Sequence, residues 1–213
     1  MMAGVLYIIA LLLALGLGVP SSATGEGTLK WFSGQTTLAY TWYGLAIAAD
    51  ILLVPALLAL YLALKGINKN AVLAAAGIGG LALALDLGVN LITWIALITL
   101  SQNYAAATSD IQRAAFVATA DYAVGITSVS ATVFSSIIFS IWPLITSLVM
   151  LKGIFSKATS YAGISGSIIG IGYGLTVFVP YSSSLAILLA LMILLFTVWL
   201  LLAGYRLYGL GKR

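Results

Sequence analysis

The sequence contains no cysteine and no histidine. These two absences exclude, within this chain, disulfides, iron–sulfur clusters, thiolate or imidazole metal sites, and nucleophile systems built on Cys or His. Charge is also scarce, because only 7% of the residues are charged, against about 25% in an ordinary soluble domain. The net charge of +4 forms no basic stripe with interleaved aromatic residues. We therefore expect no metal, no cofactor and no nucleic-acid partner.

Apolar side chains make up 62% of the 213 residues, compared with about 45–50% in soluble domains. A protein core of this size cannot absorb that excess, so the composition indicates a lipid bilayer as the surrounding solvent. A membrane-spanning helix needs about 20 apolar residues, and the chain has room for six. The predicted fold class is therefore all-α, as an integral membrane bundle of six transmembrane helices.

Proline, glycine and polar clusters set the expected helix boundaries within one transmembrane domain, residues 1–213. Pro20 and Pro180 end two apolar runs, and Ser109 with Gln112 has the spacing of a capping box. The predicted spans are 3–19, 37–64, 71–100, 127–151, 158–179 and 185–207, preceded in the fourth case by an outer helix, 109–125.

The outer helix follows from a length argument. An uninterrupted helix over 109–151 would be about 63 Å long, roughly twice the hydrocarbon thickness of about 30 Å. Its first part carries Asp110, Arg113 and Asp121. We expect that part to lie at or beyond the membrane surface, with a bend near Gly125, and Asp121 to be a solvated or capping acid.

The basic residues predict the orientation in a cell membrane. With the N-terminus in the cytoplasm, seven basic residues fall in the cytoplasmic loops and tail, and only Lys30 and Arg113 fall outside. Cytoplasmic loops of membrane proteins are enriched in Lys and Arg. We therefore expect cytoplasmic N- and C-termini in a multi-pass protein of the plasma membrane.

The phrase Leu-Lys-Gly-Ile occurs twice, at 64–67 and 151–154, each time at the end of a predicted helix. We expect Gly66 and Gly153 to adopt the left-handed conformation that often follows a helix end. An Ala-Gly-Ile phrase follows each copy. The chain therefore resembles three tandem helical hairpins, through a true duplication or through shared helix-end signals.

Small and hydroxyl residues recur along three of the helices. Such residues allow close helix contact in lipid, and hydroxyls can bond to their own backbone carbonyls; a ligand groove or a polar lining is the alternative. The residues are Gly77, Gly80, Ala84 and Gly88; Gly163, Gly166, Gly170 and Gly174; and Ser128, Ser130, Thr132, Ser135, Ser136 and Ser140.

Two acids lie deep within apolar segments. Asp50 stands 15 residues before Lys65, and Asp86 stands 17 residues after Lys69. At the rise of an α-helix both are about 22–26 Å from the cytoplasmic helix ends, so they share a depth on consecutive antiparallel helices. Asn90 follows Asp86 by one turn on the same face.

This depth makes Asp50, Asp86, Asn90 and Tyr43 the candidate site. A carboxylate at the middle of a bilayer is costly and often functional, so one interpretation is an ion or proton site with a shared proton. The other is structural: two protonated acids tie helices together through Asn90, Tyr43 or backbone carbonyls. The residues alone leave both open.

Residues 151–170, L-K-G-I-F-S-K-A-T-S-Y-A-G-I-S-G-S-I-I-G, and residues 198–207, V-W-L-L-L-A-G-Y-R-L, resemble the C-terminal half of a prokaryotic six-helix membrane family of unknown function, the DUF4386 type. The likeness covers about 140–208 closely and the N-terminal half in layout. It implies six helices, and it implies no reaction, cofactor or catalytic residue.

The function expected from these features is that of a polytopic membrane protein without enzymatic chemistry. It would be an accessory or structural subunit, or bind lipid or a small apolar ligand, with membrane lipid and a larger complex or homo-oligomer as partners. The alternative is a proton- or cation-linked transporter of small solutes that uses Asp50 and Asp86. Neither acid stands in the Tyr-Asp or Gly-x-Gly-Asp setting of intramembrane aspartyl proteases.

Overall fold

The computed structural model describes residues 1–18, 24–130, 136–176 and 184–212, and all the regular elements in these ranges are helical. The predicted all-α class is therefore confirmed. The elements are α1 (Met2–Leu17), α2 (Gly25–Ser33), α3 (Thr36–Leu85), the π-helix η1 (Asp86–Leu91), α4 (Ile92–Ala106), α5 (Asp110–Ser130), α6 (Phe139–Met150), α7 (Lys157–Leu175) and α8 (Ser184–Gly211).

Helix α3 is a hairpin of two arms that meet at Asn68. This residue alone leaves the helical conformation, with φ −152° and ψ 88°, and its Oδ1 accepts a hydrogen bond from the Ala71 amide at 3.1 Å. The first arm is 36–67; the second runs from 69 through η1 into α4. The loop predicted between 64 and 71 is thus almost wholly helical, because one capped residue is enough to reverse the chain.

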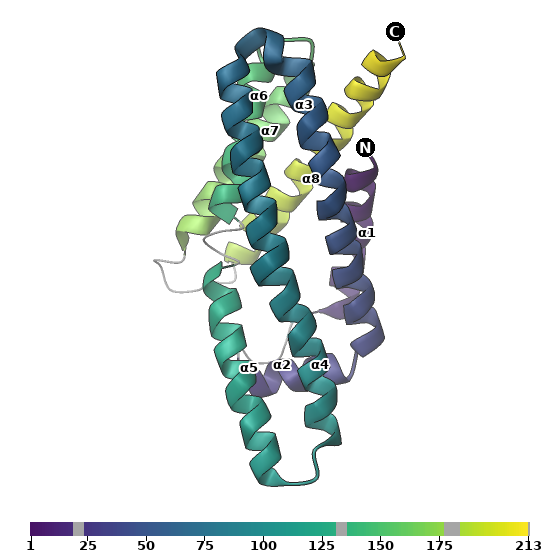
Figure 1. Ribbon diagram of the computed structural model, residues 1–213, viewed down its shortest axis with the longest axis vertical. Helices are drawn as coiled ribbons and strands as arrows, with labels where there is room; N and C mark the ends of the chain where they lie inside the picture. Colours follow the sequence, from purple (N-terminus) through teal and green to yellow (C-terminus); the bar gives the residue numbers. More distant parts are fainter. Residues whose placement is uncertain (19–23, 131–135, 177–183, 213) are drawn as a thin grey trace.

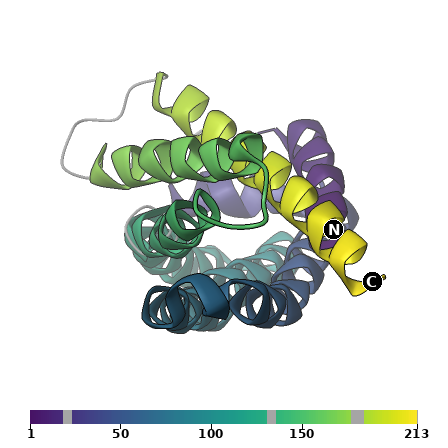
Figure 2. The same ribbon diagram turned by 90° about the horizontal axis from the view of Figure 1, so that it is seen from above.

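Five helices surround a common interior. Contacts join α3 to α6, α6 to α7, α7 to α8, α8 to α1, and α1 back to α3. Seen from above, α6 lies between α7 and α3, and α1 lies between α8 and α3 (Figure 2). Because α3 contributes two arms, the ring consists of six helical segments.

Helices α2, α4 and α5 form a separate group at the end opposite the α3 hairpin (Figure 1). Helix α1 ends at Gly18, which adopts a positive φ of 68°, and its Leu17 carbonyl accepts hydrogen bonds from Trp31 Nε1 at 3.0 Å and Gln35 Nε2 at 3.1 Å. Asp121 Oδ1 accepts from the Gly25 amide at 2.5 Å. Asp121 is therefore a capping acid, one of its two predicted roles.

The bend predicted near Gly125 is wrong, since α5 continues through this residue to Ser130. Segment 127–151, predicted as a single helix, begins within α5 and contains α6, and its residues 131–135 lie outside the described ranges. Ser109 does begin α5: its Oγ accepts from the Gln112 amide at 3.3 Å. The ends of the predicted spans 3–19 and 158–179 also lie outside the described ranges, within 19–23 and 177–183.

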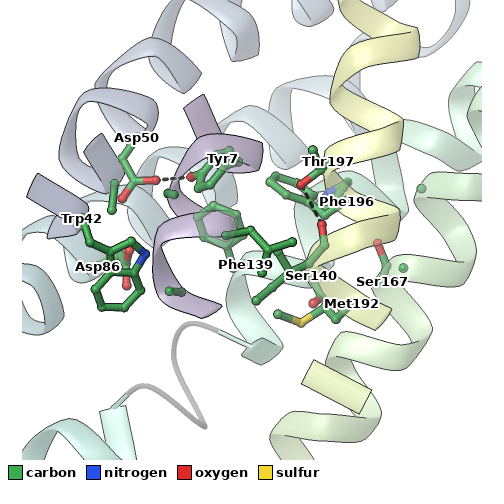
Figure 3. Close-up of a pocket in the computed structure, with 18 residues that line it drawn as sticks. Tyr7, Trp42, Asp50, Asp86, Phe139, Ser140, Ser167, Met192, Phe196 and Thr197 are labelled. Atoms are coloured by element: carbon green, nitrogen blue, oxygen red, sulfur yellow. Dashed lines mark hydrogen bonds between the residues drawn. The ribbon is translucent and has the colours of Figure 1, made fainter. Parts of the chain in front are cut away.

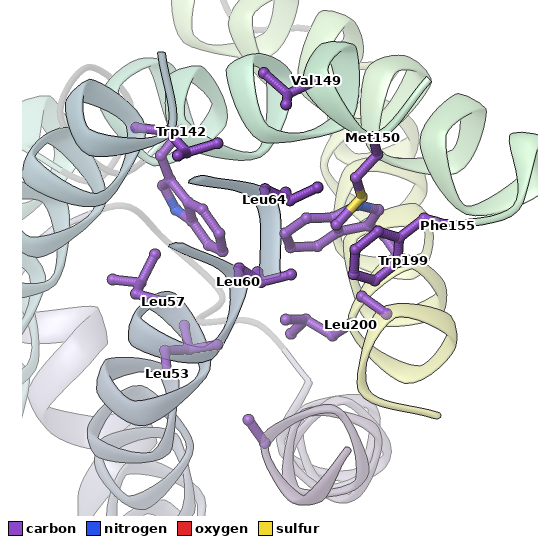
Figure 4. Packing of buried hydrophobic residues seen from close by; sticks show 14 of the residues in the cluster. Leu53, Leu57, Leu60, Leu64, Trp142, Val149, Met150, Phe155, Trp199 and Leu200 are labelled. Atoms are coloured by element: carbon purple, nitrogen blue, oxygen red, sulfur yellow. The ribbon is translucent and has the colours of Figure 1, made fainter. Parts of the chain in front are cut away.

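The largest core cluster joins α3, α6 and α8 toward the hairpin end (Figure 4). Leu53, Leu60 and Leu64 of the first arm are buried there together with Trp142 and Trp199, each of which is at most 4% exposed. The two indole rings meet edge to face with centroids 5.2 Å apart. This arrangement fixes the positions of the helices around the interior.

The glycines of α7 confirm the packing interpretation. A Cβ built on Gly163 would lie 2.6 Å from the Trp199 ring, and one on Gly170 would lie 2.8 Å from Met192 Sδ. The same interpretation is wrong for the second arm of α3. A Cβ on Gly77, Gly80 or Gly88 would meet no described atom within 4 Å, because these residues face away from the ring.

The two Leu-Lys-Gly-Ile copies contact each other. A Cβ on Gly153 would lie 2.3 Å from Ile67 Cδ1 and 3.6 Å from Leu64 Cδ2. The left-handed conformation predicted for Gly66 and Gly153 is wrong, since Gly18 is the residue with positive φ within the described ranges. The α3 hairpin and the α6–α7 turn therefore pack together at one end, which also carries Lys65, Lys69, Lys152, Lys157 and, on α8, Arg206 and Lys212.

In the described ranges two helices are long and apolar enough to cross a membrane, 36–106 and 187–211. The first of these contains the break at Asn68, so it comprises two antiparallel segments. Helices α1 and α6 are shorter and also apolar.

Candidate functional site

A cavity of about 280 Å³ lies within the ring of helices, and it is lined from α1, both arms of α3, α6, α7 and α8. Its wall is mostly apolar. The exception is one side, where Asp50 of the first arm and Asp86 at the start of η1 both reach the cavity (Figure 3). The two acids whose depths were matched from the sequence are thus brought to one space.

Asp50 is 2% exposed. The Tyr7 hydroxyl of α1 donates a hydrogen bond to its Oδ1. Its second oxygen, Oδ2, is buried and receives no hydrogen bond from a donor group in the described ranges. The neighbouring Asp86 is close enough to act on Asp50 by charge and by a side-chain hydrogen bond, which two carboxyl groups can form only while one of them is protonated.

Asp86 and Asn90 lie at the two ends of one wide helical turn. The Asn90 amide donates to Asp86 Oδ1 at 2.7 Å, and both residues belong to η1. Short π-helical turns are rare and occur frequently at functional sites. The predicted pairing of Asn90 with an acid is therefore present, within a local distortion of the helix.

Aromatic rings form much of the remaining wall. Trp42 and Asp86 both line the cavity, and Tyr7 lies between Asp50 and the rings of Phe139 and Phe196 (Figure 3). Tyr7 and Phe196 pack edge to face with centroids 6.0 Å apart. The cavity therefore has an acidic side and an aromatic, apolar interior.

Three serine or threonine residues line the cavity: Ser140, Ser167 and Thr197. The Ser140 hydroxyl donates to the Ser136 carbonyl at 2.5 Å, and the Thr197 hydroxyl donates to the Ile193 carbonyl at 2.7 Å. These two hydroxyls bond within their own helical segments, as expected for hydroxyl residues in membrane helices, whereas Ser167 Oγ is buried and has no hydrogen-bond partner in the described ranges. Ser140 also faces the cavity, while the side chains of Ser128, Ser130, Thr132 and Ser135 lie outside the described part of the structure.

Tyr43 does not reach the cavity. It is 4% exposed and belongs to the second core cluster, where its ring stacks on Trp94 at 6.1 Å and meets Trp42 at 4.3 Å. The proposed tie from Tyr43 to the acids is therefore wrong, because Tyr43 lies two turns, or about 10 Å, from Asp50 along the same face of the first arm and packs in the second core cluster instead. The tyrosine that binds Asp50 is Tyr7.

Tyr7 is the residue that sequence reasoning missed. Counted along α1 from Met2, it lies about 7.5 Å from the helix start, much less than the depth inferred for Asp50. However, α1 begins well below the α3 hairpin in Figure 1, and this offset brings Tyr7 level with Asp50. The sequence did contain a signal for this role, because Tyr7 is the one side chain with a hydroxyl group in the otherwise aliphatic segment 3–19.

The site offers two adjacent carboxyl groups, two neutral hydrogen-bond donors and an apolar space. Among the residues that the structure describes, no three His, Cys, Asp or Glu side chains gather as metal ligands would. The arrangement can hold and release protons and can attract a positive charge into an apolar environment.

These features define an all-α helical protein with two neighbouring acids, one of them buried, at an apolar cavity between the helices. A family model described as a domain of unknown function, DUF4386, matches residues 2–204. The chain belongs to this family, as its C-terminal phrases predicted. No curated protein and no solved structure matches it.

Proposed function

We propose that the chain is an integral membrane protein whose six ring segments cross the bilayer: α1, the two arms of α3, α6, α7 and α8. The outward faces support this proposal. The first arm buries Leu53, Leu57 and Leu60 and yet exposes Ile51, Val54, Leu58 and Leu62. A helix that is apolar all round suits a membrane or a large protein core. Helix α8 likewise exposes Ile187, Leu191, Leu194, Val198 and Leu202.

The charge distribution supports an orientation in the cell membrane. The end with the α3 hairpin and the α6–α7 turn carries the basic residues named above, whereas Glu26, Asp110 and Asp121 belong to the opposite group of helices. Following the enrichment of Lys and Arg in cytoplasmic loops, the basic end with both termini faces the cytoplasm. Helices α2 and α5 then cover the outer surface.

The absence of native cysteine makes this topology directly testable. In intact cells, a membrane-impermeant maleimide labels Glu26→Cys and leaves Lys152→Cys unlabelled until the membrane is opened. Labelling of both before opening, or the reverse order, contradicts the topology. Each variant carries the single thiol of the chain, so no background thiol complicates the result.

Within this membrane protein, the cavity binds a small, largely apolar molecule, without enzymatic chemistry. The observation that carries this function is an internal space of about 280 Å³ walled by aromatic and aliphatic side chains. Since each water molecule takes up about 30 Å³ in the liquid, the space has the volume of roughly nine water molecules. Apolar pockets with a few convergent polar groups are the usual form of a ligand site.

Neopentylbenzene, a neutral apolar probe of suitable size, tests this function. Calorimetry with the full chain in phosphatidylcholine nanodiscs is expected to show saturable binding. The binding is lost in Ala46→Phe, which fills the cavity, and is retained in Ala74→Phe, which places the same ring on the exposed side of the second arm. If the two variants bind the probe with equal affinity, or if both lose binding, binding in the cavity is refuted.

A role as an accessory subunit is compatible with the same site, with lipid around the bundle and a second protein or copy at its surface. The outward face of Gly77, Gly80 and Gly88 meets no part of the described chain, so it is open to such neighbours. Purification in mild detergent tests this. A monodisperse monomer without a co-purifying protein argues against a subunit role.

Proton- or cation-linked transport is the second candidate, because Asp50 and Asp86 meet at the cavity. In proteoliposomes, a cation gradient is then expected to drive proton movement that Asp50→Asn abolishes. If Asp50→Asn and Asp86→Asn both leave every measured flux unchanged, transport through these acids is excluded.

A further inference from the structure

We propose that the cavity binds an organic ammonium ion with an apolar body, placing its positive centre at Asp50 and Asp86, and that one proton leaves the acidic pair as the cation enters. This inference rests on the proposed ligand-binding function and specifies its ligand class. It is carried by the buried, unpartnered Oδ2 of Asp50 and by the aromatic wall beside it.

Charge is the first argument. Asp50 and Asp86 are close neighbours, and no Lys or Arg is among the side chains that line the cavity in the described ranges. An uncompensated negative charge in such surroundings costs several kcal/mol. Because Asp50 is 2% exposed, its carboxyl group therefore carries a proton when the site holds no ligand.

The hydrogen bonds fit a protonated Asp50. The Tyr7 hydroxyl donates to Asp50 Oδ1, so this oxygen already has a donor. Asp50 Oδ2 is buried and receives no hydrogen bond from a donor of the described chain, so it is the oxygen that carries the proton. The site thus has one proton that a cation can replace.

The exchange conserves charge within the cavity. As the ammonium ion enters, the O–H bond at Asp50 Oδ2 breaks, its electron pair stays on the oxygen, and the proton passes to water outside. The resulting carboxylate pairs with the cation, so the net charge of the site is unchanged. No oxidant, reductant or other reactant is needed.

The aromatic residues favour an organic ammonium over a bare metal ion. Tyr7 contacts Asp50, and Trp42 lines the same cavity; aromatic faces attract ammonium groups, including quaternary ones. Phe139 and Phe196 provide an apolar place for the remainder of the molecule. A hydrated inorganic ion would leave this part of the cavity unfilled.

Two probes of nearly the same shape separate the effect of the ligand's positive charge on binding from the effect of its apolar body. Benzyltrimethylammonium and neopentylbenzene differ in having a positive nitrogen or a neutral carbon at the same position. Binding of each to the full chain is measured by calorimetry in nanodiscs of zwitterionic phosphatidylcholine, in buffers that differ in ionisation enthalpy. Because the quaternary ammonium has no exchangeable proton, any proton released comes from the protein.

The wild-type chain is expected to bind benzyltrimethylammonium about tenfold or more tightly than neopentylbenzene, with release of about one proton. Asp50→Asn removes the preference for the cation and the proton release, while neopentylbenzene still binds. Asp110→Asn, the same change at an exposed acid outside the cavity, leaves both unaltered.

Equal affinities of the two probes for the wild-type chain overturn the inference and leave apolar ligand binding intact. A preference that persists in both Asp50→Asn and Asp86→Asn also overturns it. If neither probe binds, the proposed function fails as well. The wild-type comparison needs no variant, so a folding defect cannot obscure the result.

Discussion

Replacement of Gly25 by alanine tests the attachment of the outer group of helices. A Cβ at this position would lie 2.4 Å from the Asp121 backbone nitrogen and 2.8 Å from the Ala120 carbonyl carbon. Ordinary carbon contacts are about 3.5–4.0 Å, so α2 and α5 must separate by about 1 Å. Backbone atoms cannot rotate away as a side-chain tip can, and the separation also breaks the bond from the Gly25 amide to Asp121 Oδ1, now 2.5 Å long.

The expected cost has two parts. Overpacking costs about 1–3 kcal/mol, and loss of a hydrogen bond to a charged group costs about 1.5–3 kcal/mol. Together they predict a loss of about 2.5–6 kcal/mol in the free energy that holds α2 to α5. For a chain of this size, about 2–4 °C for each kcal/mol gives a melting temperature lower by roughly 5–24 °C.

The assay is thermal unfolding in detergent, followed by tryptophan fluorescence, since Trp31 lies on α2. Gly77→Ala is the control, because a Cβ there meets no described atom within 4 Å and alanine favours a helix over glycine by about 1 kcal/mol. If the melting temperature of Gly25→Ala equals that of the wild type or of Gly77→Ala, the docking of α2 against α5 is refuted.

Three further predictions concern other elements. Gly163→Ala is expected to lower stability by about 1–3 kcal/mol, because its Cβ would meet the Trp199 ring at 2.6 Å, whereas Gly172→Ala on the same helix meets open space; equal melting temperatures contradict the α7–α8 packing. Asn68→Ala removes the cap at the α3 hairpin and is expected to cost about 1 kcal/mol in the same assay, and no change argues against that cap. Hydrogen bonds from Lys30, at 2.7 Å, and then from Tyr104 lower the pKa of Glu26 below its ordinary 4.5. The folded protein therefore binds this proton less tightly than the unfolded chain, so the pair stabilises α2 above about pH 4.5 and the stabilisation is lost as the pH falls through the lowered pKa. Glu26→Gln is expected to remove that part of the acid dependence of the melting temperature, and an unchanged profile shows that the pair does not contribute.

The meeting of Asp50 and Asp86 was predictable because a hairpin imposes simple arithmetic. Two antiparallel arms with a common end place residues at equal distances from that end side by side, and Lys65 and Lys69 mark the end well. The same counting failed for Tyr7. Helix α1 does not begin at the level of the hairpin, and the offset between helices that are not joined by a tight turn depends on packing.

The remaining errors also reflect packing that sequence patterns do not specify. Small residues occur at helical spacing on both α7 and the second arm of α3, but only on α7 does a neighbouring helix occupy that face. Asn68 shows that a single capped residue can replace the predicted loop. Tyr43 and Tyr7 are chemically alike, but Tyr43 is two turns away from Asp50 along the first arm, and the packing of α1 against that arm brings the Tyr7 hydroxyl to Asp50.

The position of a bound cation tests the central claim most directly. A crystal structure of the full chain with 4-bromobenzyltrimethylammonium would locate the bromine by its anomalous signal. We predict one bromine peak inside the cavity, near Phe139 and Phe196, with the ammonium group against Asp50 and Asp86. An empty cavity at a saturating concentration of the cation, or a bromine peak only outside the ring of helices, would contradict the account.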